Sequence, residues 1–186
     1  WLFDLGVIQH SIEVKSDRHY GYRVQVDNRY LRSLGVGVSQ VIPVIAVCLL
    51  AEHGSLIMLE EPELHLNPSI QQKLGDFFLA MTESGRQLLV ETHSEYLITR
   101  LRLRAMQNPE YVDSFNFIFT HQEHETNNRL SGNSRYSVYR EIKPSSTGEL
   151  PEWPEGFFDQ VTTDIQALLE EMIKRQGAIG EPSQDI

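Results

Sequence analysis

Apolar residues along this chain recur first with the period of a strand and then with the period of a helix. Residues 21–26 alternate between polar and apolar side chains, which predicts a half-buried strand. The short apolar runs at 55–60 and 87–91 predict two further strands, the first of them buried. Between these runs, Asn67 caps a predicted helix with Pro68 at its first position. Another helical pattern follows the second run, so the order of elements predicts an α/β fold, a parallel sheet flanked by helices.

A strongly apolar segment at 40–52 predicts one more helix. It has no polar face, so we expect it to be buried on all sides. Pro43 would lie in its first turn, where a missing N–H group costs little. The segment before it, from Leu34 to Gln40, contains two glycines and predicts a turn.

The pattern changes after residue 108. Strands are predicted at 115–120 and 136–142, with a polar loop at 121–134 between them. A last amphipathic helix is predicted to start near Gly156 and to bury six apolar side chains, those of Phe158, Val161, Ile165, Leu168, Leu169 and Met172. We therefore expect three parts, an α/β domain at 1–108, a small α+β extension at 109–178 and a flexible tail at 179–186.

Composition and charge narrow the class of protein. The 186 residues include 16 basic and 26 acidic side chains, a net charge of −10, which argues against this segment being the main surface for nucleic acid. The single Cys48 excludes an internal disulfide and suits the cytosol. The longest apolar stretch, 41–51, is too short to span a bilayer, so we expect a cytoplasmic protein without a membrane segment. Because the chain begins at Trp1 rather than Met, we expect it to be a piece of a longer protein.

Two adjacent carboxylates end the apolar run at 55–60. Glu60 and Glu61 follow four apolar residues, and Pro62 ends the strand directly after them. Because a buried carboxylate without a partner is costly, we expect a cation, a polarised water or a phosphate beside them. In a nucleotide-hydrolysing site the first acid would order the shell of Mg²⁺, and the second would polarise the attacking water. The run therefore predicts a Walker B strand and one half of an ATP site.

Two other segments are predicted to reach the same place. His93 ends the next strand, and the carboxyl ends of parallel strands meet at one edge of a sheet, so we expect it near Glu60 and Glu61. An imidazole there can hydrogen-bond a γ-phosphate and the attacking water. The turn before the apolar helix offers backbone N–H groups and a hydroxyl to an anion, through Gly35, Gly37, Ser39 and Gln40.

These segments, in this order, resemble the C-terminal lobe of ABC-type ATPases, particularly the SMC/RecF-like and OLD (overcoming lysogenization defect) branch. The signature motif, usually Leu-Ser-Gly-Gly-Gln, has a divergent counterpart in Val36-Gly37-Val38-Ser39-Gln40. Leu56–Glu61 resembles Walker B, Glu63–Asn67 resembles the D-loop and Glu91–Ser94 resembles the H-loop. The phrases Glu-Glu-Pro-Glu-Leu-His-Leu-Asn-Pro and Val-Glu-Thr-His-Ser-Glu-Tyr-Leu are especially similar to bacterial OLD-like AAA-family ATPases, and 153–159 resembles a tail domain of unknown function in such proteins.

The resemblance implies a P-loop NTPase fold of the ABC-like C-terminal kind. It also implies a homodimer that closes on ATP. The implied activity is on DNA, either together with a nuclease partner or in anti-phage defence. By this resemblance Glu60 would bind Mg²⁺, and Glu61 and His93 would be catalytic. Four residues would contact the ATP of a second subunit, namely Gly35, Gly37, Ser39 and Gln40. Glu63 and His65 would contact the nucleotide as part of the D-loop.

The phosphate-binding half of such a site is missing from the sequence. No Gly-x-x-x-x-Gly-Lys-Ser/Thr segment occurs in the 186 residues, so the β- and γ-phosphates lack their main clamp. We expect this segment alone to bind ATP poorly and to need an N-terminal lobe with Walker A. Two other functions stay open, a scaffold or partner-binding module with an ATPase-like fold, or a divalent-metal nuclease centre built from Glu60, Glu61, Glu63, His65 and Glu91.

Overall fold

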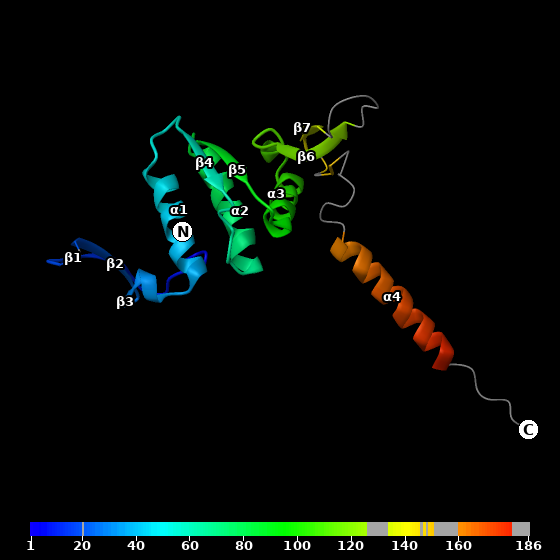
Figure 1. Ribbon diagram of the computed structural model, residues 1–186, viewed down its shortest axis with the longest axis horizontal. Helices are drawn as coiled ribbons and strands as arrows, with labels where there is room; N and C mark the ends of the chain where they lie inside the picture. The colour runs from blue at the N-terminus through cyan, green and yellow to red at the C-terminus, as the bar shows by residue number, and fades with distance from the viewer. Residues whose placement is uncertain (20, 126–133, 146, 148, 151–159, 180–186) are drawn as a thin grey trace, which may run out of the picture. The chain divides into compact units, whose positions relative to one another are not determined.

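The chain divides into two units, each with its own helices and strands. The computed structural model describes residues 1–19, 21–125, 134–145, 147, 149–150 and 160–179. By the contacts between residues, the first unit comprises Trp1–Asn116 and Lys143–Glu149. The second unit comprises Phe117–Ile142 and Leu150–Ile186. Figure 1 shows the elements of each unit along the chain. No helix within the described ranges is long and apolar enough to cross a bilayer.

The first unit begins with a small antiparallel sheet. Its strands are β1 (Ile12–Asp17), β2 (Gly21–Val26) and β3 (Arg29–Tyr30), in the order β1-β2-β3. The predicted strand at 21–26 is therefore confirmed. β1 was not predicted, although Ile12 and Val14 alternate with Glu13 and Lys15, and almost all of its side chains are exposed.

Asp27 closes the turn that follows β2. Its carboxylate accepts backbone N–H groups from Gln9, His10 and Ser11 at 2.9, 2.7 and 3.0 Å. The hydrogen bonds from the backbone of Gln9 and Ser11 lower the pKa of the Asp27 carboxyl. The contacts attach the segment before β1 to the antiparallel sheet.

A two-stranded parallel sheet and three helices form the centre of the first unit. The two strands, β4 (Leu56–Glu60) and β5 (Gln87–Glu91), are the only parallel pair among the described strands, and every other described pair is antiparallel. The α/β class is thus confirmed in its coarse form, whereas a wide parallel sheet is not seen. The helices are α1 (Val36–Leu50), α2 (Pro68–Glu83) and α3 (Glu95–Gln107), with the short 3-10 helices η1 (Leu31–Ser33) and η2 (Pro109–Tyr111) before α1 and after α3.

The helices cover one face of the parallel sheet. The predicted start of α2 is confirmed, because the Asn67 side chain accepts the N–H of Ile70 at 3.0 Å. Burial raises the pKa of the Cys48 thiol, which is free. The shared core comprises Leu5, Val41, Ile45, Cys48, Ile57, Leu66, Leu74, Phe77, Phe78, Met81 and Leu97.

The opposite face of the parallel sheet is open. Leu56 and Met58 on β4 are 58% and 70% exposed, and Leu89 on β5 is 49% exposed. Met58 lies opposite Leu89, so their side chains share one surface. The prediction of a buried strand is therefore wrong for one face of β4. Strands that are apolar on both faces are typical of sheets covered on both sides, and the described residues cover only one.

Helix α1 differs from its prediction in two ways. It begins at Val36 after Gly35, so most of the predicted turn is helical, and Pro43 lies in the helix interior rather than in the first turn. The sequence favoured a turn there because Gly35 and Gly37 are turn signals, whereas Gly35 is the N-cap and Gly37 lies inside the helix. Burial is also one-sided, since Ile45 is 1% exposed but Leu50 is 83% exposed.

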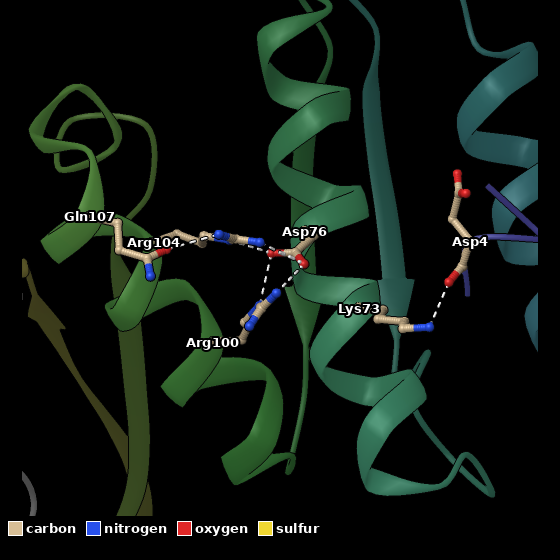
Figure 2. Close-up of polar contacts among 6 residues, drawn as sticks. All are labelled: Asp4, Lys73, Asp76, Arg100, Arg104 and Gln107. Atoms are coloured by element: carbon tan, nitrogen blue, oxygen red, sulfur yellow. Dashed lines mark hydrogen bonds and ion pairs between the residues drawn. The ribbon is translucent and has the colours of Figure 1, made fainter. Parts of the chain in front are cut away.

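Charged side chains join α2 to α3. Figure 2 shows Arg100 and Arg104 of α3 converging on Asp76 of α2. Arg100 donates through Nε and Nη2 at 3.0 and 2.7 Å, and Arg104 through the same atoms at 2.7 and 3.1 Å. Burial alone would raise the pKa of Asp76, but the hydrogen bonds from both arginines outweigh it and hold the pKa below its ordinary value. Lys73 points away from this cluster and donates to the carbonyl of Asp4 at 2.7 Å.

The second unit contains a hairpin and a helix. Strands β6 (Phe117–Glu125) and β7 (Ser134–Ile142) pair antiparallel, which confirms both predicted strands and extends them into the predicted loop. Helix α4 comprises Gln160–Ile179 among the described residues. The predicted start near Gly156 lies outside the described residues, as do 180–186 of the predicted tail.

The apolar positions of α4 are not buried as predicted. Ile165, Leu168, Leu169 and Met172 are 51%, 63%, 54% and 57% exposed. Their spacing is that of one helix face, so the pattern correctly indicated an amphipathic helix. The side chains of Phe158 and Val161 lie outside the described residues.

Candidate functional site

Acidic side chains surround a pocket at the carboxyl end of β4. Glu60 lies opposite Glu91 in the parallel register, and the N–H of Glu61 donates to the carbonyl of Glu91 at 2.9 Å. This is the edge at which the sequence predicts the acids, because the carboxyl ends of parallel strands share it. The pocket has a volume of about 410 Å³ and is lined by Gln40, Val44, Glu60, Glu61, Pro62, Leu64 and Glu91.

Glu61 and His93 meet beside this pocket. His93 Nε2 lies 3.4 Å from Glu61 Oε1, an ion-pair distance when the imidazole is protonated. Glu61 has a φ of +41°, in the left-handed region that side chains other than glycine seldom adopt, and such residues cluster at functional sites. The Glu61 and His93 side chains are 41% and 71% exposed, so a ligand can reach both.

Glu63 is turned into the protein rather than into the pocket. It is only 6% exposed, although the resemblance places it in a D-loop at the nucleotide. Its Oε1 atom accepts the hydroxyl of Thr92 at 2.6 Å and the N–H of His93 at 2.9 Å. The contacts connect the loop after β4 to the turn after β5.

The contacts of two polar side chains in the same region were not predicted from the sequence. The hydroxyl of Ser94 caps α3 by accepting the N–H of Leu97 at 3.1 Å, and it donates to Gln71 Oε1 at 2.6 Å. The amide of Gln71 then donates to the carbonyl of Leu66 at 2.8 Å. A serine before an apolar helix signals a cap, whereas nothing in the spacing of Gln71 signals its contacts.

The residues of the divergent signature motif do not gather at one point. Gln40 lines the acidic pocket, but the hydroxyl of Ser39 donates to the carbonyl of Leu31 at 3.0 Å, next to a different pocket. Gly35 is the N-cap of α1. A Cβ atom added to Gly37 would lie 2.5 Å from the carbonyl oxygen of His65, so α1 packs directly on the loop after β4.

Gly37→Ala is expected to destabilise the chain by about 1–3 kcal/mol, because the added methyl group overlaps backbone that cannot rotate away. At an ordinary helical position the same change stabilises by up to about 1 kcal/mol. Urea unfolding followed by circular dichroism measures the difference. Gly75→Ala, inside α2, is the matched control, since its Cβ would make only ordinary contacts, the nearest at 3.5 Å; equal stabilities of the two variants would contradict the close approach.

Carboxylates of the kind that bind Mg²⁺ line the pocket. Within the described part of the chain, no group of three or more His, Cys, Asp or Glu side chains is arranged to hold a metal ion, so the five residues of the nuclease alternative do not form one cluster. Mg²⁺ in phosphate-transfer sites keeps several waters and uses one or two carboxylates beside the phosphate oxygens. Glu60 and Glu91, paired across the strands at the pocket, provide carboxylates of this kind.

Comparison with known families agrees with the class of protein that these elements indicate. Residues 15–99, which include α1, the acidic strand and His93, match the family described as "AAA domain, putative AbiEii toxin, Type IV TA system". The match supports an AAA-type P-loop ATPase and suggests an ATPase-like function that uses a nucleotide and Mg²⁺. Residues 120–168 match a protein family of unknown function, DUF3696. No curated protein matches the chain.

Proposed function

We propose that residues 1–108 are the C-terminal lobe of an ATP-hydrolysing enzyme of the ABC/OLD-like kind, and that the pocket at Glu60 and Glu61 is the water-activating side of its ATP site. The observation that carries this proposal is the contact between Glu61 and His93 beside the acidic pocket. A carboxylate that accepts a proton and an imidazole that donates a hydrogen bond can activate the attacking water and orient the γ-phosphate.

Each residue has a distinct task in this proposal. Glu60, with Glu91 beside it, would hold Mg²⁺, which neutralises charge on the phosphate oxygens. Glu61 would take the proton of the attacking water, and its exposed side chain leaves room for that water. His93 would donate a hydrogen bond to the γ-phosphate and orient it toward Glu61.

The open face of the parallel sheet supports a second lobe. Leu56, Met58 and Leu89 form an apolar surface that ends at Glu60 and Glu91. A lobe that covered this surface would bury the apolar side chains and would also reach the acidic pocket. We assign to it the phosphate-binding loop that the 186 residues do not contain.

Completion of the site is the test of the proposal. The 186-residue chain alone is expected to hydrolyse no ATP above background, because the β- and γ-phosphates have no clamp. Addition of an N-terminal lobe with a Gly-x-x-x-x-Gly-Lys-Ser/Thr loop should create ATPase activity that depends on Mg²⁺. Strong hydrolysis by the chain alone, or none after completion, would overturn the division of tasks between the lobes.

The remaining parts of the proposal concern assembly. We propose a homodimer in which the start of α1, from Gly35 to Gln40, faces ATP held by the other copy, as in the ABC-type ATPases that the motifs resemble. Sedimentation of the completed protein with and without ATP tests this arrangement. Work on DNA or in anti-phage defence is proposed on the same resemblance, and binding of DNA by the completed protein with ATP tests it.

A scaffold without activity and a metal-dependent nuclease are less favoured. Glu63, one of the five residues of the nuclease set, already binds Thr92 and the backbone of His93. Metal-dependent cleavage of DNA without ATP would restore that alternative, and failure of the completed protein to bind ATP would favour the scaffold.

A further inference from the structure

One carboxylate holds the turn after β5 through the Thr92 hydroxyl and the His93 backbone. Glu63 Oε1 accepts the hydroxyl of Thr92 and the N–H of His93, at 2.6 and 2.9 Å. The Thr92 hydroxyl in turn accepts the N–H of Ser94 at 3.0 Å. Glu63 therefore binds the His93 backbone directly, and it reaches the Ser94 backbone only through the Thr92 hydroxyl.

The contacts of Glu63 belong to a closed ring of hydrogen bonds. From Ser94 the ring continues through Gln71 to the carbonyl of Leu66, as described above. The N–H of Leu66 donates to the carbonyl of Glu63 at 3.0 Å, which returns the ring to its start. The loop after β4 and the turn after β5 are thus connected at two points, so neither can shift without breaking several bonds.

Glu63 stands apart from the acids of the pocket by its burial. It is 6% exposed, and its Oε2 atom has no hydrogen-bond partner among the described protein atoms. A buried carboxyl group is costly to retain, and an apolar side chain would fill the same space. The presence of a carboxylate at position 63 is explained by the two hydrogen bonds that it accepts, because hydrogen bonds to a charged acceptor are stronger.

We propose that Glu63 is a positioning residue for catalysis, which holds the His93 backbone so that the imidazole stays in contact with Glu61. The role of His93 in hydrolysis rests on the proposed function, but the positioning itself does not. The imidazole is 71% exposed and packs against little. Its direction is therefore set mainly by the backbone from which it extends, and Glu63 fixes that backbone.

Glu63→Met and Glu63→Gln form a matched pair that separates positioning from packing. Both side chains are close to glutamate in length and lack its charge, but only glutamine keeps an oxygen acceptor. Amide hydrogen exchange in the ¹⁵N-labelled 186-residue chain, without nucleotide, reads the contact directly. Exchange at His93 should rise about tenfold or more in Glu63→Met and by a much smaller factor in Glu63→Gln, since a hydrogen bond to a buried acceptor is lost in the first only.

The β4–β5 ladder serves as the internal reference. The amide of Glu61, bonded to the carbonyl of Glu91, should keep its exchange rate within about threefold in both variants. Thr92→Val removes the hydroxyl that donates to Glu63 while keeping the side-chain volume. It should also speed exchange at Ser94, because the Thr92 hydroxyl accepts the N–H of Ser94. Unchanged exchange at His93 in Glu63→Met, or equal changes in the methionine and glutamine variants, would overturn the positioning role.

Kinetics of the completed ATPase give a second, independent measurement. Glu63→Met should lower kcat about tenfold or more with little change in KM for ATP, and Glu63→Gln should restore most of it. Faster exchange at His93 with an unchanged kcat would retain the structural contact but refute positioning for catalysis. Absence of ATP hydrolysis in the completed wild type would instead refute the proposed function, and the exchange data would still decide whether Glu63 fixes His93.

Discussion

Glu61→Gln is expected to lower ATP hydrolysis by the completed enzyme about a hundredfold or more, because an amide cannot accept the proton of the attacking water. ATP binding should be retained, since glutamine keeps the length of the side chain and removes a negative charge from beside the phosphates. The φ of +41° at Glu61 is no obstacle, because glutamine meets the same backbone strain as glutamate. Steady-state kinetics and equilibrium binding of a fluorescent ATP analogue measure the two effects separately.

Glu52→Gln is the control for this experiment. It removes the same charge from an exposed side chain just after α1 and should leave kcat unchanged. Hydrolysis by Glu61→Gln at near the wild-type rate would assign the base to another residue. A joint loss of ATP binding and hydrolysis would instead assign Glu61 to binding.

Asp76→Asn is expected to lower the free energy of unfolding by about 2–3 kcal/mol at neutral pH. Asparagine keeps one oxygen acceptor, but it leaves two guanidinium groups, 26% and 34% exposed, without a counter-charge. Urea unfolding of the 186-residue chain measures the change. Asp113→Asn, at an exposed carboxylate, is the control and should change stability by less than about 0.5 kcal/mol.

The effect of Asp76→Asn should depend on pH in a defined direction. The pKa of Asp76 is lower in the folded chain than in the unfolded chain, where it is about 4. The carboxylate therefore contributes its full stability above that value, and the contribution is lost as the pH falls through the lower, folded pKa. The difference between wild type and Asp76→Asn should be constant from neutral pH to about 5 and should shrink below 4. A difference that stayed constant into acid would show that the contacts with Arg100 and Arg104 do not depend on charge.

Local patterns predicted much of the first unit. Alternation of side chains gave β2, and the Asn67-Pro68 start gave α2, because both signals depend only on neighbouring residues. The meeting of Glu61 with His93 was also predictable, since carboxyl ends of adjacent parallel strands share an edge. The roles of these residues remain predictions.

Other features depend on contacts that sequence spacing does not reveal. The burial of Glu63 requires Thr92, which is distant in sequence, and the close packing of Gly37 requires the backbone of His65. An apolar run likewise indicates that both faces of a strand will be buried. It does not indicate whether the residues that bury them belong to the same segment of the protein. For that reason β4 and α4 were predicted buried although several of their apolar side chains are exposed.

The close contact beneath Gly37 has a consequence for movement. The loop after β4 rests on α1 through the carbonyl of His65, and the ring through Glu63 attaches it to the turn after β5. The loop therefore cannot swing as a lid over a nucleotide without breaking the packing at Gly37 or the ring. Any closure of the loop over a nucleotide would have to carry α1 and the turn after β5 with it, so a hinge for that movement would lie outside the segment from α1 to α3.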